Sequence, residues 1–170
     1  MMDFLSNLEQ SSFSQWVLSA NTIWAYPMIL FLHTVGMALV AGLSSVIDLR
    51  LLGFAPKTAI RPLARLYPFI WIGFAINLLT GTALLIADAT TKLTNADFYI
   101  KMVFVFGGVA ILAAMRWKVF GNPKLDESPV SPMAKRLGFL SLVCWVGAIT
   151  CGRLLAYLGT VSGLPGLKNR

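Results

Sequence analysis

Four long runs of apolar residues dominate the chain, separated by short stretches that contain most of the charged residues. The runs cover residues 24–47, 67–87, 98–117 and 137–158. A helix needs about 20 apolar residues to cross the hydrocarbon core of a bilayer, and each run meets that length. The pattern therefore predicts an all-α integral membrane protein, folded as an antiparallel four-helix transmembrane bundle. Because four spans and their connections use nearly all of the 170 residues, we expect one membrane domain over residues 1–170.

A shorter amphipathic pattern precedes the first run. Within residues 12–20, the side chains of Phe13, Trp16, Val17 and Ala20 fall on one helical face. This pattern suits a short interfacial helix on the outer side of the membrane, with the Trp16 indole at the level of the lipid headgroups. The alternative is a frayed lead-in to the first span.

Composition and charge agree with a membrane location. The chain is 57% hydrophobic and 12% charged, whereas a soluble domain has roughly 25% charged residues. In a soluble protein the net charge of +7 would suggest a nucleic-acid partner. Here the basic residues concentrate in two connections, the first with Arg50, Lys57, Arg61 and Arg65, the third with Arg116, Lys118, Lys124, Lys135 and Arg136. Since Lys and Arg accumulate in cytoplasmic loops, we expect both chain ends outside, contact with membrane lipid, and no nucleic acid.

Polar residues inside the predicted spans can be placed by depth. His33, the only histidine, lies about 13 Å below the outer end of the first span at 1.5 Å per residue. Lys101 lies about one turn into the third span, Arg153 lies near the outer end of the fourth, and Asn77 lies in the middle of the second. Ionisable residues inside a membrane usually mark functional sites, so the outer half is the predicted site. The alternatives are that Lys101 and Arg153 extend to the interface, and that His33 only hydrogen-bonds the backbone or Asn77.

The residue types in the outer half suit a haem. Histidine is the usual proximal ligand of haem iron, so His33 is the candidate metal ligand. Gly36, one turn away, would let a flat ring approach the helix, and Lys101 and Arg153 have the depth to hold propionates. With one histidine, the sixth ligand would be Met102, Met115, water or a group from a partner. A quinone needs similar features in weaker form and stays an alternative cofactor.

The inner end of the first span carries Asp48 and Arg50, which we expect to anchor the helix at the lipid boundary. Arg50, Arg61 and Arg65 can reach lipid phosphates, and Asp48 can form a salt bridge with any of them. In the fourth span, Ala148 and Gly152 form a small-xxx-small pair that favours close helix packing. The packing partner is a neighbouring helix of the bundle, a partner membrane subunit or a second copy of the chain.

Two segments carry a resemblance to known families. The stretches "LHTVGMALVAGLSSVIDLRLLGFAP" and "CWVGAITCGRLLAYLG" resemble an uncharacterised bacterial family of small four-span membrane proteins. This resemblance implies the bacterial cytoplasmic (inner) membrane and brings no activity with it. A more distant likeness is to the J-type protoporphyrinogen oxidases and the copper-resistance D domain, in which His33, Arg50, Thr80-Gly81 and Lys101 match. The oxidases carry another histidine just after the arginine, where this chain reads "LLGFAP", so only a haem or porphyrin near His33 and Lys101 is carried over.

Three functions follow from these patterns. The first is a b-type haem protein that passes electrons to or from quinone or a periplasmic partner. The second is a cofactor-free structural or accessory subunit of a larger membrane complex, favoured by the absence of a second haem ligand. The third is a small transporter. It ranks last because the two halves of this chain lack the matched helix interruptions typical of transporters. A hydrolytic enzyme is disfavoured because the sequence shows no activated Ser or Cys and no second histidine from which a nucleophile–base pair could be built.

Overall fold

A computed structural model describes residues 2–123, 125–127 and 129–158, and every regular element in these ranges is helical. This result confirms the predicted all-α class. The elements are α1 (Met2–Glu9), α2 (Ser12–Ser19), α3 (Tyr26–Met37), η1 (Ala38–Gly42), α4 (Leu43–Leu52), η2 (Arg61–Leu66), α5 (Tyr67–Ala87), α6 (Ala89–Leu93), α7 (Ala96–Lys118) and α8 (Pro132–Leu158). The expected outer position of the C-terminal tail concerns residues 159–170, which lie outside the described residues.

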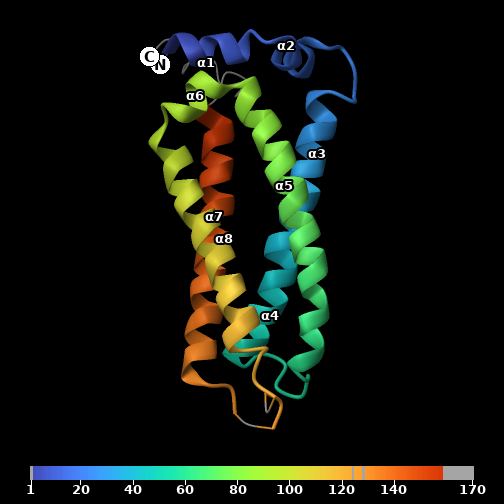
Figure 1. Ribbon diagram of the computed structural model, residues 1–170, viewed down its shortest axis with the longest axis vertical. Helices are drawn as coiled ribbons and strands as arrows, with labels where there is room; N and C mark the ends of the chain where they lie inside the picture. Colours follow the sequence, from blue (N-terminus) through green and yellow to red (C-terminus); the bar gives the residue numbers. More distant parts are fainter. Residues whose placement is uncertain (1, 124, 128, 159–170) are drawn as a thin grey trace.

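Four helical segments are long and apolar enough to cross a membrane, as the sequence predicted. They are Tyr26–Leu52, Arg61–Ala87, Ala96–Lys118 and Pro132–Leu155. They run side by side along the long axis of the molecule (Figure 1). The first is longer than expected, because it ends only where Gly53 adopts a left-handed conformation with φ of 109°. Asp48 and Arg50 therefore lie within this helix.

The first long segment contains a π-helical turn that the hydrophobic pattern did not predict. This turn, η1, joins α3 to α4. Its wider winding inserts one residue per turn and changes which residues share a face, and such turns occur frequently at functional sites. Met37 and three residues of this turn, Ala38, Ala41 and Gly42, line one cavity.

Two glycines bring α3 and α5 into backbone contact. A Cβ atom on Gly73 would lie 2.6 Å from the Leu39 Cβ and 2.9 Å from the Gly36 carbonyl oxygen. A Cβ atom on Gly36 would lie 2.9 Å from the Gly73 carbonyl oxygen. Real Cβ atoms do not approach other atoms this closely, so only glycine fits either side of the crossing.

The helices α1 and α2 lie across one end of the long helices (Figure 1). We call the half of the bundle next to α1 and α2 the upper half, and the other half the lower half. The Glu9 carboxylate accepts hydrogen bonds from the Thr90 backbone N–H at 2.7 Å and from its hydroxyl at 2.5 Å. Val17 is buried, whereas Phe13 and Trp16 are exposed. The residues expected on one face of α2 are therefore separated: Val17 packs on the bundle, whereas the rings of Phe13 and Trp16 point outward. Helix α1 was not predicted.

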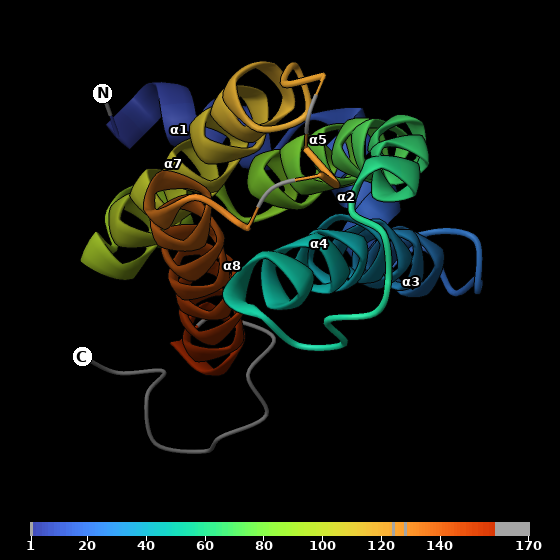
Figure 2. The same cartoon turned by 90° about the horizontal axis from the view of Figure 1, so that it is seen from below.

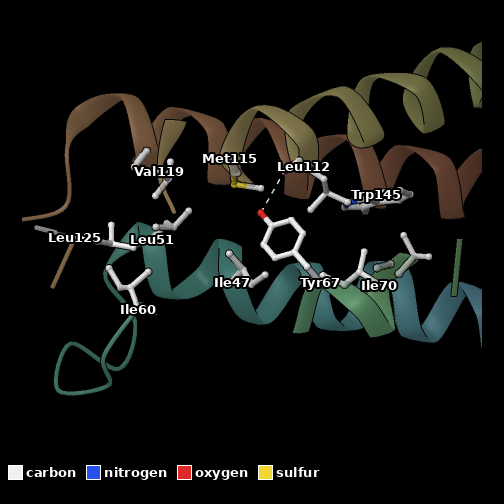
Figure 3. Packing of buried hydrophobic residues seen from close by; sticks show 13 residues of the cluster. Ile47, Leu51, Ile60, Tyr67, Ile70, Leu112, Met115, Val119, Leu125 and Trp145 are labelled. Carbon is white, nitrogen blue, oxygen red and sulfur yellow. Dashed lines mark hydrogen bonds between the residues drawn. The ribbon is translucent and has the colours of Figure 1, made fainter. Parts of the chain in front are cut away.

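The lower half holds most of the apolar core. Ile47, Leu51, Tyr67, Leu112 and Met115 are buried there, and the Tyr67 hydroxyl donates to the Leu112 carbonyl oxygen at 3.3 Å (Figure 3). Seen from below, α8 lies beside both α7 and α4, and α3 packs on α5 (Figure 2). Because buried side chains fill the lower half, space for a ligand is found in the upper half.

Candidate functional site

A cavity of about 460 Å³ lies in the upper half, within the range of about 300–1,000 Å³ typical of small-molecule sites. The helices α3, α5, α7 and α8 form its walls, η1 lies deepest, and Leu18 of α2 borders its upper end. Most lining side chains are apolar or small. The polar groups among them include His33, Asp88, Lys92, Lys101 and Arg153.

The His33 imidazole is fixed by a hydrogen bond to α5. Its Nδ1 atom lies 2.9 Å from the Thr80 hydroxyl oxygen, and that hydroxyl lies 2.6 Å from the Ile76 carbonyl oxygen. Because a carbonyl only accepts, the Thr80 proton goes to Ile76, and we assign the His33 proton to Nδ1. The Nε2 atom then keeps its lone pair, and it has no hydrogen bond to any described residue.

Gly81 makes this position of the imidazole possible. A Cβ atom on Gly81 would lie 3.2 Å from the His33 Cε1 atom and 3.7 Å from Nδ1. The ring therefore lies directly against the backbone of α5. Thr80 and Gly81 act together, one by holding the ring nitrogen and the other by leaving space for the ring.

Three cationic side chains reach the cavity. The Lys101 side chain lies against Gly152, where an added Cβ atom would be 3.8 Å from its Nζ atom. Neither Lys101 nor Arg153 forms an ion pair with another described residue. The Lys92 Nζ atom lies 3.9 Å from the Asp88 carboxylate and also donates to the Leu84 carbonyl. Burial lowers the pKa of the Lys92 amine, and the charge of Asp88 opposes that shift. With one acid against three cations, the cavity suits a ligand with anionic groups.

The structure brings together four of the residues that the sequence selected. His33, Lys101, Gly152 and Arg153 all line the cavity. Gly152 and Ala148 of the expected packing pair also line this cavity; Gly152 lies against the Lys101 side chain of α7, and Ala148 is fully buried. The depth of each residue, counted from the ends of the spans, was the signal that grouped His33, Lys101 and Arg153.

Four other candidates lie elsewhere. Gly36 packs on α5, where its missing Cβ would be 3.1 Å from the Asn77 backbone nitrogen, so helix backbone fills the space expected for a ring. Asn77 lies at the same crossing, and its side-chain oxygen is buried without a hydrogen bond. Met102 does not line the cavity. Met115 is fully buried in the lower core.

The residues at the lower end of the first long segment also differ from expectation. Asp48 is fully buried, and neither carboxyl oxygen has a hydrogen-bond partner. The expected salt bridge to Arg50, Arg61 or Arg65 is absent from the described residues. Arg50 instead donates to the carbonyl oxygens of Thr58 at 2.5 Å and Pro56 at 3.0 Å, and so closes the following loop. Arg65 is exposed.

Sequence reasoning missed Lys92 as part of the site. Lys92 lies on helix α6, in the short connection between α5 and α7, and its side chain lines the cavity. Gly81 was noted only for a resemblance, and its contact with His33 was not foreseen. Its position one turn after Asn77, next to Thr80, was the available signal.

No group of three or more His, Cys, Asp or Glu residues able to hold a metal ion occurs in the part of the chain that the structure describes. Comparisons with known proteins give no match: no protein-family model, no curated protein and no solved structure matches the chain. The geometry of the cavity is therefore the basis for proposing a function.

Proposed function

We propose that the protein is a multi-pass protein of the bacterial inner membrane that binds haem b in the upper half of an antiparallel four-helix bundle and takes part in electron transfer. In this proposal the upper half faces outward. The helices α1 and α2 then lie in the outer interface, where the exposed rings of Phe13 and Trp16 meet the lipid headgroups. The basic first and third connections lie on the cytoplasmic side, as the distribution of Lys and Arg favours.

The observation that carries the proposal is the hydrogen bond between His33 and Thr80. A histidine that ligates a metal through one ring nitrogen almost always donates a hydrogen bond from the other, which fixes the ring and its tautomer. His33 has this arrangement, with Nδ1 held by Thr80 at 2.9 Å and the Nε2 lone pair available. Such a nitrogen suits iron. It does not suit a quinone carbonyl, which needs a donor, so the tautomer favours haem.

The remaining residues of the cavity fit the periphery of the same group. A single imidazole would be sufficient, because a porphyrin brings its iron already coordinated. Lys101 and Arg153, which have no ion pair among the described residues, would hold the two propionates. Apolar side chains such as Leu84, Leu85 and Phe98 line the same cavity and would pack against the porphyrin ring. When bound, haem would supply one-electron chemistry, with a potential set by its protein ligand and by burial.

Replacing Thr80 by valine is expected to weaken haem binding about 10- to 100-fold, the usual effect of losing the hydrogen bond behind a metal-ligating histidine. Valine keeps the shape of threonine but cannot accept the Nδ1 proton, so the imidazole loses its fixed orientation. The measurement is a titration of the purified apoprotein with haem, followed by the Soret absorbance.

Thr82→Val is the matched control, because Thr82 lies on the same helix, is exposed, and donates only to the Leu78 carbonyl at 2.8 Å. Its haem affinity should equal that of the unchanged protein. Equal affinities for Thr80→Val and Thr82→Val would show that the His33–Thr80 contact has no part in haem binding.

A further inference from the structure

A second set of buried polar groups lies below the cavity, along the contact between α4 and α8. Ser44 and Asp48 are one turn apart on α4, and Ser141 and Trp145 are one turn apart on α8. Relative exposure is 0% for Ser44, Asp48 and Ser141, and 2% for Trp145. Both Asp48 carboxyl oxygens, the Ser141 hydroxyl oxygen and the Trp145 Nε1 atom have no hydrogen-bond partner.

The two helices approach closely at this level. A Cβ atom on Gly138 would lie 3.1 Å from the Asp48 carbonyl oxygen and 3.4 Å from the Leu51 Cβ. Ser141 is one turn further along α8, and its hydroxyl and the Asp48 carboxyl group are both fully buried without a hydrogen-bond partner. Asp48 and Ser141 are thus neighbours in a closely packed interface.

The charged and titratable groups around Asp48 leave it without a counter-ion. From α5, the Tyr67 hydroxyl donates to the Leu112 carbonyl oxygen and not to Asp48. From α7, the Arg116 guanidinium lies 5.7 Å from the centre of the Tyr67 ring. On α8, Lys135 is exposed. No ion pair to Asp48 exists within the described ranges.

An ionised carboxylate in such a place would be very unfavourable. Burying an unpaired charge costs so much that the group becomes neutral instead. A neutral carboxylic acid has both an O–H donor and acceptor oxygens, and a serine hydroxyl has the same capacities. An ionised Asp48 could accept the Ser141 O–H but would remain an unpaired buried charge, whereas a protonated Asp48 can share a hydrogen bond with Ser141 and carries no charge.

We propose that Asp48 and Ser141 form a proton-binding site inside the bundle, in which one proton converts the Asp48 carboxylate to a neutral acid hydrogen-bonded to Ser141. The site is connected to the cavity by the same contact. Ala41 and Ala148 line the cavity. Ala41 is seven residues from Asp48, and Ala148 is seven residues from Ser141, a distance of about 10 Å along each helix. Ser44 and Trp145 lie between. The proposal does not depend on haem.

Infrared spectroscopy of the purified protein in an ester-free detergent tests the proposal. At pH 7 we expect the C=O stretching band of a protonated carboxylic acid, shifted to lower frequency in D₂O and absent from Asp48→Asn. Asp88→Asn is the control, since Asp88 is also buried but pairs with Lys92; this variant should keep the band. Ser141→Ala should keep the band and raise its frequency, which also tests the assignment if Asp48→Asn does not fold.

Three results would overturn the proposal. The first is the absence of the band from the unchanged protein at pH 7. The second is its loss in Asp88→Asn. The third is loss of the band when NaCl, but not choline chloride, is added at constant pH, because the site would then bind a metal cation. None of these results bears on haem binding, so the two proposals can fail separately.

Discussion

Replacing Gly73 by alanine is expected to lower the free energy of unfolding by about 3 kcal/mol, the upper end of the usual cost of overpacking. The added methyl group would lie 2.6 Å from the Leu39 Cβ and 3.1 Å from the Val40 nitrogen. These atoms belong to helix backbone or to its first side-chain atom, so no rotamer change relieves the contact. The helices α3 and α5 must separate, and the His33–Thr80 hydrogen bond joins the same two helices. Denaturant unfolding in mild detergent, followed by tryptophan fluorescence, measures the change.

The control is Gly42→Ala. A Cβ atom on Gly42 would meet nothing within 4 Å, and its φ of −65° is helical. Since alanine is favoured over glycine within a helix by about 1 kcal/mol, this variant should be as stable as the unchanged protein or more so. Equal losses of stability in both variants would contradict the close approach of α3 and α5.

Replacing His33 by alanine is expected to reduce haem affinity at least about 100-fold, beyond the loss from disturbing a group that only orients the ligand. The variant removes the one imidazole of the chain and leaves the apolar wall and the cations in place. The measurement is the Soret absorbance of the purified variant after incubation with haem. Added imidazole should restore part of the absorbance by entering the vacated space.

Leu32→Ala serves as the control on the same helix, because Leu32 is exposed and does not line the cavity. It should bind haem as the unchanged protein does. If His33→Ala binds haem with unchanged affinity and spectrum, His33 is not the ligand, and its bond to Thr80 only joins α3 to α5.

The four long helices could be predicted because length and hydrophobicity are local properties of the sequence. Their ends could not be placed from hydrophobicity alone. The first long segment runs past Asp48 and Arg50 to Gly53, a glycine in the position typical of a helix end. Helix α1 escaped prediction because its placement depends on a distant contact, between Glu9 and Thr90.

The depth of each site residue along its helix could be predicted, but the rotation of each helix about its own axis could not. Counting residues from the span ends grouped His33, Lys101 and Arg153 correctly in one cavity. It could not show which face of each helix points inward, so Gly36, Asn77 and Met102 were included although they do not line the cavity. The π-helical turn at Ala38–Gly42 changes the faces again. The unpaired state of Asp48 depends on packing between α4 and α8, which no sequence pattern reports.

Haem binding is tested by the absorption spectrum of the unchanged protein, purified in mild detergent from cells supplied with haem. The cavity with His33, Lys101 and Arg153 predicts a Soret band at a stoichiometry near one haem per chain. A colourless preparation that also gains no Soret band on incubation with haem would contradict it.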